Sequence, residues 1–422
     1  MKLKNLVISL VVLILLGVLA YFIAVPRIAG KAYHDALQLK DSMKYQEALV
    51  KFNKAIRYNS KVNDYYLQRG IVKSALNADS SALVDFNTVL ERDSLVFDAY
   101  LYRGISYRKL ADFKLAMHDI NHAIDLNDSS SLAYYQRGLL YAATMDFDKA
   151  LADYNKSIEL DGTNLEAFYS RGESLANLDD FKGAIADYDK LIEGPNASPE
   201  AYKKRGIFKL NIQDYQGAVN DFKIAIKGLS NDKDLLCNYG TACSDLKQYD
   251  EALTYLNKAI SIDPNFSLAY GIKGGVLLRK GDFNQALKTF NKAISLTPKY
   301  VKALYGRGIA KAFMKDYRGS IGDFTEVIKT NPDFIQAYYN RAVSKAILKE
   351  HKSAILDYDI AIKADSKNAE AYYNRGISRI NVQDYKGGCE DFHEAYSLGY
   401  QPAEQMINIY CPKDKNTHVI VK

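Results

Sequence analysis

Residues 337–365 read AYYNRAVSKAILKEHKSAILDYDIAIKAD, and residues 371–399 read AYYNRGISRINVQDYKGGCEDFHEAYSLG. The two stretches align without a gap at an offset of 34 residues. Apolar residues in such stretches recur three and four positions apart, which is the spacing of one face of an α-helix. A short polar turn divides each stretch into two helical segments. The pattern therefore predicts a unit of two helices that the chain repeats every 34 residues.

The same period runs through most of the chain, marked by one small residue in each repeat. These residues are Ala36, Gly70, Gly104, Gly138, Gly172, Gly206, Gly240, Gly274, Gly308, Ala342 and Gly376. A glycine in the middle of a helix costs roughly 0.5–1 kcal/mol relative to alanine, so we expect close approach of a second helix there. Residues 29–400 hold eleven repeats, which start at residues 29, 63, 97, 131, 165, 199, 233, 267, 301, 335 and 369.

This arrangement of small and large residues resembles the tetratricopeptide repeat family, whose unit is a 34-residue helix–turn–helix. The eighth repeat fills the family's positions in order with Tyr270, Gly274, Ala286, Phe290, Ala293 and Pro298. The resemblance implies an all-α fold, an α/α solenoid (a TPR superhelix) of about eleven repeats. It also implies a concave groove, lined by the first helix of each repeat, that binds protein or peptide partners.

An arginine precedes the small residue in eight repeats, and an aspartate stands sixteen residues after it in the same eight. The pairs are Arg69 with Asp85, Arg103 with Asp119, Arg137 with Asp153, Arg171 with Asp187, Arg205 with Asp221, Arg307 with Asp323, Arg341 with Asp357, and Arg375 with Asp391. The remaining repeats change both positions together, as in Asp35 with Lys51, Tyr239 with Tyr255, or Lys273 with Thr289. We therefore interpret the pairs as structural ion pairs between two helices of one repeat, rather than as a row that binds an anionic ligand.

The N-terminal segment, residues 1–28, has a different character from the repeats. Its residues 6–25 carry no charge, and at about 1.5 Å per residue a helix of this length spans about 30 Å, the thickness of a bilayer's hydrocarbon core. A cleavable signal peptide has a shorter apolar stretch, so the length favours an uncleaved signal anchor with a transmembrane helix over 6–25, although cleavage stays open. We expect a single-pass membrane protein.

The side of the membrane on which the repeats lie is less strongly indicated. Lys2 and Lys4 precede the span and Arg27 and Lys31 follow it, so the basic residues do not favour a cytoplasmic N-terminus. A resemblance to bacterial signal anchors with a short lysine-bearing start implies that the repeats are exported, to the periplasmic side. A cytoplasmic side stays open.

Residues 401–411 are predicted to form a capping helix, and residues 412–422 a tail. Ala403, Met406, Ile407 and Tyr410 make one apolar stripe, which suits a helix that covers the last repeat. If this helix folds back antiparallel, the two cysteines Cys389 and Cys411 come level, which permits a disulfide, although Cys389 also fits as a small core residue. Exported bacterial proteins of this family, notably of Bacteroidetes type, have a similar ending, which also points to a membrane-anchored bacterial protein.

Composition and motifs argue against several other classes of function. The net charge of +6 is spread along the chain without a basic block, which does not suggest nucleic-acid binding. His118 and His122 are four residues apart but lack a third ligand, so we expect no metal. Every segment longer than about twenty residues is assigned to anchor, repeat or cap, so we expect no enzyme, no catalytic residues and no cofactor.

The candidate site is therefore the groove. The family's fifth position in the first helix faces the ligand, and the resemblance assigns this role to Tyr135, Tyr169, Tyr305, Tyr339 and Tyr373. Tyrosine supplies large contact area with a polar tip, which suits peptide or helix recognition. The expected function is a membrane-tethered scaffold for envelope or secretion complexes. Alternatives are a cytoplasm-facing adaptor or regulator, and a non-catalytic subunit of an enzyme complex. The partner and self-association are not indicated.

Overall fold

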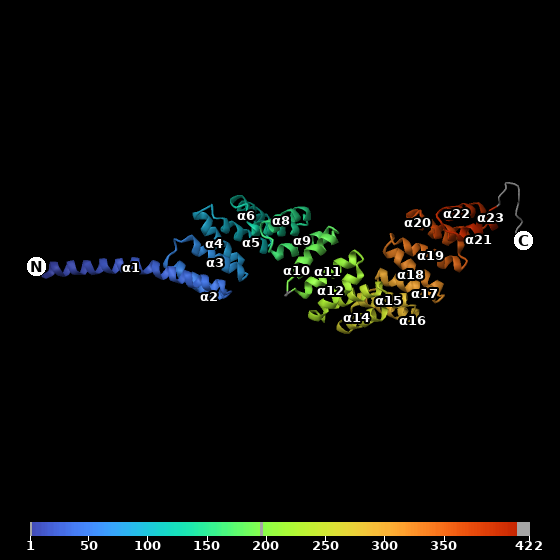
Figure 1. The fold of residues 1–422 in the computed structure, drawn as a ribbon, viewed down its shortest axis with the longest axis horizontal. Helices are drawn as coiled ribbons and strands as arrows, with labels where there is room; N and C mark the ends of the chain where they lie inside the picture. The colour runs from blue at the N-terminus through green and yellow to red at the C-terminus, as the bar shows by residue number, and fades with distance from the viewer. Residues whose placement is uncertain (1, 195–196, 412–422) are drawn as a thin grey trace. The chain divides into compact units, whose positions relative to one another are not determined.

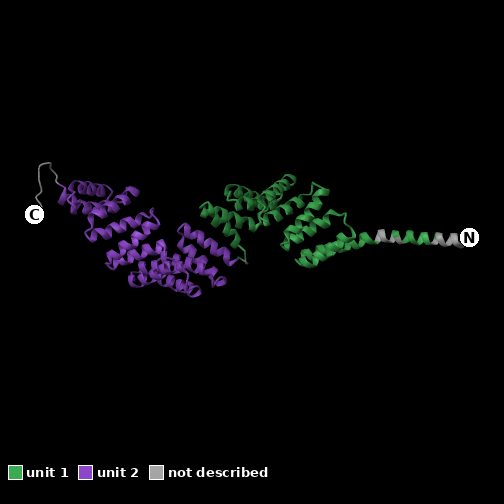
Figure 2. Cartoon of the chain, turned by 180° about the vertical axis from the view of Figure 1, so that it is seen from behind, with its two compact units in different colours: residues 1–197 green, residues 198–422 purple. Residues whose placement is uncertain are grey.

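The structure, a computed structural model, describes residues 2–194 and 197–411, without the side chains of residues 2–7, 9, 17 and 19–23. Within the described residues it contains 23 α-helices and no strand. The chain divides into two compact units, residues 1–197 and 198–422 (Figure 2). Successive helices form antiparallel pairs in each of them (Figure 1).

The first compact unit holds ten helices, of which the first is much the longest. They are α1 (Lys2–Asp41), α2 (Tyr45–Tyr58), α3 (Asn63–Ala75), α4 (Asp79–Arg92), α5 (Phe97–Lys109), α6 (Phe113–Leu126), α7 (Ser131–Ala143), α8 (Phe147–Leu160), α9 (Leu165–Asn177) and α10 (Phe181–Ile192). From α3 to α21, each odd-numbered helix begins at the residue where the period places the start of a repeat.

The second compact unit continues the same alternation and ends with a short helix. Its helices are α11 (Pro199–Asn211), α12 (Tyr215–Gly228), α13 (Lys233–Asp245), α14 (Tyr249–Ile262), α15 (Ser267–Lys280), α16 (Phe283–Leu296), α17 (Val301–Phe313), α18 (Tyr317–Thr330), α19 (Ile335–Ile347), α20 (His351–Ala364), α21 (Ala369–Asn381), α22 (Tyr385–Ser397) and α23 (Pro402–Tyr410). Within each compact unit a first helix packs on its own second helix, and that second helix packs on the next first helix.

The recurring glycine allows the two helices of a repeat to approach closely. A Cβ atom built on Gly70 would lie 2.6 Å from Cε1 of Phe86, and one built on Gly274 would lie 2.6 Å from Cε1 of Phe290. Both aromatic rings are buried. The missing side chain therefore makes room for the large residue of the second helix, which is the physical reason for the small–large pattern of the sequence.

The turn between the two helices of a repeat uses a left-handed residue that the sequence pattern does not mark. At this position Gly281 has φ +86°, but the other repeats place a non-glycine residue there, such as Met43 with φ +58° or Lys315 with φ +65°. A left-handed conformation costs roughly 1–2 kcal/mol for an L-residue with a Cβ. Side chains following the turn compensate in part, since Asp316 accepts a hydrogen bond from the backbone N–H of Gly319 at 2.9 Å and caps α18.

The first repeat and the N-terminal segment share one helix. The helix α1 continues through Pro26 to Asp41, so the expected boundary between residues 28 and 29 is not a break in the backbone. Among the described residues, no helix has the length and apolarity needed to cross a bilayer. Several side chains of the transmembrane helix expected over 6–25 lie outside the described residues, and this expectation has no support from the structure.

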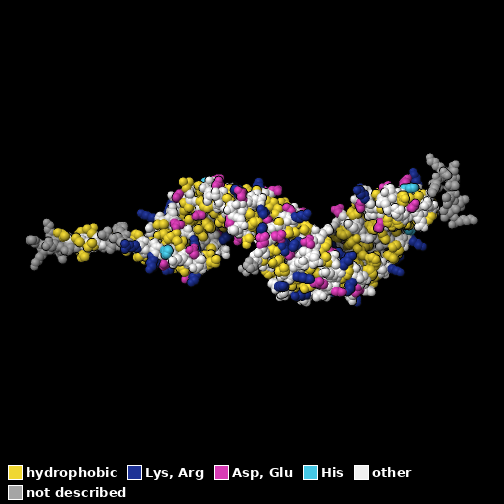
Figure 3. All heavy atoms as spheres, viewed as in Figure 1, with side chains coloured by type: hydrophobic (Ala, Val, Ile, Leu, Met, Phe, Trp, Pro, Cys, Tyr) yellow, Lys and Arg dark blue, Asp and Glu magenta, His cyan; other side chains and the backbone are white. Residues whose placement is uncertain are grey.

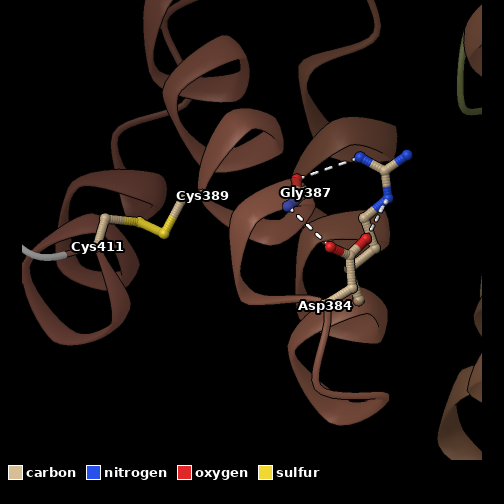
Figure 4. Close-up of a disulfide and its surroundings, with 5 residues drawn as sticks. Asp384, Gly387, Cys389 and Cys411 are labelled. Atoms are coloured by element: carbon tan, nitrogen blue, oxygen red, sulfur yellow. Dashed lines mark hydrogen bonds and ion pairs between the residues drawn. A yellow bond between two sulfur atoms is a disulfide. The ribbon is translucent and has the colours of Figure 1, made fainter. Parts of the chain in front are cut away.

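At the other end, α23 packs on α22, and a disulfide joins the two helices. Cys389 lies in α22 and Cys411 directly follows α23; the two residues point toward each other with their Cα atoms 5.6 Å apart (Figure 4). Ala403 is the fully buried residue of the cap. The bond closes a loop with a sequence separation of 22 residues, which on the chain-entropy account adds about 3 kcal/mol of stability.

Candidate functional site

In eight repeats, the arginine and the aspartate form a bidentate ion pair that holds the two helices of the repeat together. In the fourth repeat, Nε of Arg137 donates to Oδ2 of Asp153 at 2.8 Å, and Nη2 donates to Oδ1 at 2.8 Å. The same geometry recurs for the Arg69, Arg103, Arg171, Arg205, Arg307, Arg341 and Arg375 pairs. The aspartates are almost fully buried, so these residues contribute to structure and are not presented to a ligand.

The third nitrogen of the guanidinium reaches the preceding repeat. Nη1 of Arg137 donates to Oδ1 of Asn121 in α6 at 3.0 Å, and Nη1 of Arg307 donates to Oδ1 of Asn291 in α16 at 2.9 Å. The Arg137 guanidinium also lies 5.3 Å from the ring centroid of Tyr134. Each such arginine therefore fastens three helices, two of its own repeat and one of the repeat before it.

Three repeats lack this arrangement, as their sequences indicate. In the first, Lys51 and Asp35 form the pair with exchanged signs, at 3.2 Å. In the seventh, the Tyr239 hydroxyl donates a hydrogen bond to Glu251. The ring of Tyr239 lies edge-on to the ring of Tyr255, with centroids 4.4 Å apart. In the eighth, burial lowers the pKa of Lys273, for which the described residues supply no carboxylate partner.

The groove tyrosines of the last repeats form a ladder between neighbouring first helices. Asn340 of α19 donates to the hydroxyl of Tyr305 in α17 at 2.8 Å, and Asn374 of α21 donates to the hydroxyl of Tyr339 in α19 at 3.1 Å. The Tyr373 ring continues the row against Tyr400, with centroids 5.0 Å apart. The three rings are half-buried, so each keeps part of its surface for a ligand, and the hydroxyls of Tyr305 and Tyr339 each join two repeats.

Hydrogen bonding and burial also change the acidity of this row. Burial, the charge of Glu370 and the hydrogen bond that the Tyr339 hydroxyl donates to Glu370 raise the pKa of Tyr339 to about 12. Burial raises the pKa of Tyr305 as well. Both phenols therefore stay protonated at neutral pH and act as neutral hydrogen-bonding groups.

Two cavities open along this row in the second compact unit. One has a volume of about 380 Å³ and is lined by Tyr305, Ile335, Gln336, Tyr339, Asn340, Ala361, Ala364, Asp365 and Asn368. The other has a volume of about 260 Å³ and lies between α17 and α19, with a largely apolar lining. Asn340 borders both cavities, so the row offers a mixed polar and apolar surface to a bound segment.

The two candidate tyrosines of the first compact unit differ from each other. Tyr135 is only 8% exposed, since it packs on Tyr154, and its hydroxyl lies 3.4 Å from that of Ser170. The expected groove contact therefore does not suit Tyr135, because its ring is buried. Tyr169 is 42% exposed and offers its ring to solvent beside Tyr188.

Comparison with known proteins identifies the repeats. The family profile described as "Tetratricopeptide repeat" matches residues 131–164 and 234–266, and the one described as "TPR repeat" matches residues 274–312. The chain contains tetratricopeptide repeats (TPRs). No curated protein matches its sequence at a significant level.

Solved structures match this chain at low sequence identity. The crystal structure of the APC/C hetero-tetramer Cut9–Hcn1 matches with a TM-score of 0.50 and 13% identity, over 90% of this chain and 95% of that chain. Yeast Tom70 matches with a TM-score of 0.44 and 16% identity, over 91% and 94% of the two chains. A tetratricopeptide repeat protein from Parabacteroides merdae matches with a TM-score of 0.45 and 18% identity, over 59% of this chain and 99% of that one.

The TPR architecture provides a scaffold suited to protein–protein interaction, and sequence reasoning overlooked part of how this one is built. The link from arginine to the preceding repeat was not foreseen, although Asn87, Asn121 and Asn155 recur at the required spacing. The hydrogen bonds from Asn340 and Asn374 to the tyrosine row were also missed. Among the described residues, no group of three or more His, Cys, Asp or Glu side chains is placed to hold a metal ion.

Proposed function

We propose that this TPR protein is a scaffold that binds an extended or helical segment of a protein partner along the row of Tyr305, Tyr339 and Tyr373 in the second compact unit, with Tyr169 as a separate candidate contact in the first. The observation that carries the proposal is the cavity of about 380 Å³ lined by Tyr305 and Tyr339, together with the second cavity of about 260 Å³, which shares Asn340 with it. Half-buried tyrosines held by Asn340 and Asn374 lose little side-chain freedom on binding, which favours affinity.

We further propose that the N-terminal helix tethers the scaffold to a membrane. The described apolar side chains of its first half are exposed, among them Leu10, Leu13 and Leu15, so this part of α1 has no protein core to enter. The uncharged run over 6–25 is long enough to cross a hydrocarbon core. Burying these side chains in lipid would remove them from water.

We place the repeats on the exported, periplasmic side of that membrane, in the assembly of envelope or secretion complexes. The disulfide between Cys389 and Cys411 supports this placement, because such bonds persist in oxidising compartments and are rare in the cytosol. A cytoplasm-facing adaptor and a non-catalytic subunit of an enzyme complex are the alternative functions. In intact cells, a membrane-impermeant thiol reagent applied after a mild impermeant reductant distinguishes the two sides.

The groove is tested by site-specific photocrosslinking in cells. A photoreactive residue at Tyr169 or Tyr339 is expected to capture a defined protein. The same residue at Ile224, which is 41% exposed on the second helix α12, serves as the control. Capture of the same protein from the groove positions only supports the proposal, whereas equal capture from Ile224 contradicts it.

A further inference from the structure

The larger of the two cavities along the tyrosine row, of about 380 Å³, combines apolar and aromatic walls with one charged residue. That residue is Asp365, which directly follows α20. Among the described residues that line the cavity there is no Lys, Arg or His. Hydrophobic side chains, tyrosines included, gather over the α17 to α19 part of this compact unit (Figure 3). The cavity therefore suits a group with an apolar stem and a positively charged end.

The Asp365 carboxylate is only half used inside the protein. Its Oδ1 accepts a hydrogen bond from the backbone N–H of Lys367 at 3.0 Å, whereas Oδ2 has no donor within the described part of the chain. A second carboxylate lies close by, since Glu370 accepts a hydrogen bond from the hydroxyl of Tyr339, which also lines the cavity, at 3.2 Å. Neither carboxylate forms an ion pair with a described residue, so both are available to a cation from outside.

The seventh repeat fills the equivalent place with a lysine of its own. Three periods of 34 residues relate the two sites, so that Ile335 corresponds to Lys233, Asp365 to Asp263 and Asn368 to Phe266. Nζ of Lys233 donates to Oδ2 of Asp263 at 2.5 Å and lies 4.4 Å from the ring centroid of Phe266. The seventh repeat therefore holds an ammonium group against this carboxylate and an aromatic ring.

The eighth repeat also joins these two positions to each other. Thr297, which corresponds to Asp365, donates to the hydroxyl of Ser267, which corresponds to Ile335, at 2.9 Å. In the tenth repeat this link is missing, because the side chain of Ile335 has no polar atom. The aspartate keeps its place there without an internal partner, and Ile335 contributes an apolar wall instead.

We propose that this cavity takes a lysine or arginine side chain of the partner segment, with its aliphatic stem against Ile335 and its cationic head at Asp365. The inference rests on the scaffold function proposed above and names what this part of the row selects. The rings of Tyr305 and Tyr339 would add to the attraction, since a cation is stabilised over the face of an aromatic ring. A carboxylate or phosphate group of a partner would meet only negative charge there.

The test is selection from a synthetic library of random peptides by the purified full chain. Acetylated N-termini ensure that side chains are the only cations in the peptides. The parent is expected to enrich peptides with Lys or Arg at one position of a shared motif. Asp365→Asn removes the carboxylate, and Ile335→Lys supplies an internal ammonium as Lys233 does, so each is expected to remove this preference.

Asp161→Asn is the matched control. Asp161 directly follows α8 as Asp365 follows α20, and its Oδ1 accepts a backbone hydrogen bond from Thr163 in the same way. This substitution removes the same charge from the chain, but the residue lies in the first compact unit, away from the cavity. It is expected to leave the preference unchanged. Circular dichroism shows whether each variant retains its helix content.

The most enriched peptide then allows a double-mutant cycle by fluorescence titration. Its basic residue is kept or replaced by norleucine, and each peptide is titrated with the parent and with Asp365→Asn. Either single change should weaken binding by about fivefold, and the two together no more than either alone, because both remove the same contact. Additive effects would mean that the two groups do not meet.

The outcomes separate this inference from the scaffold function. Enriched peptides that require Tyr339 but show no basic preference overturn the inference and leave the scaffold function standing. The same holds for additive effects, for a preference that survives Asp365→Asn, and for one that Asp161→Asn also removes. Enrichment of no peptide, or enrichment that Tyr339→Ala leaves unchanged, overturns both.

Discussion

Arg137 and Asn121 are joined across two successive repeats, since Nη1 of Arg137 donates to Oδ1 of Asn121 at 3.0 Å. The other two guanidinium contacts hold Asp153 within the same repeat as Arg137. One side chain thus sets both the pairing of helices inside a repeat and the stacking of one repeat on the next. In a solenoid, where each repeat contacts only its neighbours, such a residue transmits stability along the chain.

Removing this arginine is expected to destabilise the folded chain. Arg137→Ala should lower the free energy of unfolding by about 3 kcal/mol, because the buried Asp153 carboxylate is left without its partner. Asn121→Ala should lower it by about 1.5 kcal/mol, as expected for a hydrogen bond to a charged group. Urea unfolding followed by circular dichroism measures both. Lys156→Ala, which breaks an exposed ion pair with Glu159, is the control and should change stability by less than about 1 kcal/mol.

Two adjacent glycines in α15 should respond oppositely to the same substitution. Gly274→Ala should destabilise by about 1–3 kcal/mol, because the new Cβ would lie 2.6 Å from the buried ring of Phe290. Gly275→Ala meets nothing within 4 Å and should stabilise by about 0.5–1 kcal/mol, through the gain in helix propensity. Thermal unfolding of the two variants gives the comparison. Equal effects would show that close helix approach is not why the glycine recurs.

The four cysteines should separate into two classes. Burial raises the pKa of the Cys237 thiol to about 12 and that of the Cys243 thiol to about 11, so neither should react with a maleimide at pH 7.5 while the protein is folded. Cys389 and Cys411 should react only after reduction. Mass spectrometry of the labelled chain reads out both classes. Labelling of Cys411 without reductant would contradict the bridge.

Loss of the bridge should affect the C-terminal end first. The double variant Cys389→Ser and Cys411→Ser should lower the stability of this end by about 3 kcal/mol, as expected for a loop of this length. Hydrogen exchange should accelerate in α22 and α23 before it does in α13 and α14. Unchanged exchange in α23 would mean that packing on α22 alone holds the cap.

Alkaline pH should lower the stability of the folded chain through Tyr339. Its pKa is about 12 in the folded chain, against about 10 for an unfolded tyrosine. Between these values the unfolded state loses its proton first, so stability should fall as pH rises from 10 to 12. The stability of the Tyr339→Phe variant should fall less over this interval. The stability of Tyr385→Phe, at an exposed position on α22, should fall as much as that of the parent. Urea midpoints at pH 9 and pH 11.5 provide the test.

The sequence predicts the periodic part of this fold well because each repeat buries the same surfaces. The first helices of the repeats begin at the residues that the 34-residue period indicates, from Asn63 to Ala369. The left-handed turn residues could not be predicted, because Met43 and Lys315 carry no turn signal and adopt positive φ under the constraint of the packed helices. Tertiary packing overrides local preference at these positions.

The candidate site was harder to predict, since it depends on contacts between repeats. Position in the first helix indicates which tyrosines face the groove, yet it does not distinguish the buried Tyr135 from the exposed Tyr169. Both rings make the equivalent contact within their own repeat, with Tyr154 and Tyr188, so this contact does not account for the difference in exposure. The cavity beside Tyr305 and Tyr339 depends on the spacing of helices, which a repeat pattern alone does not provide.

The central claim is that the row of first helices binds a partner, and the affinity of the photocaptured protein for three forms of the chain tests it most directly. The forms are the parent, the variant with Tyr305, Tyr339 and Tyr373 changed to Ala, and a variant with Ile224 changed to Ala on α12. We predict that isothermal titration shows at least about tenfold weaker binding for the tyrosine variant, or roughly 1.4 kcal/mol, and no change for Ile224→Ala. Unchanged binding by a folded tyrosine variant, with weaker binding by Ile224→Ala, would contradict the claim.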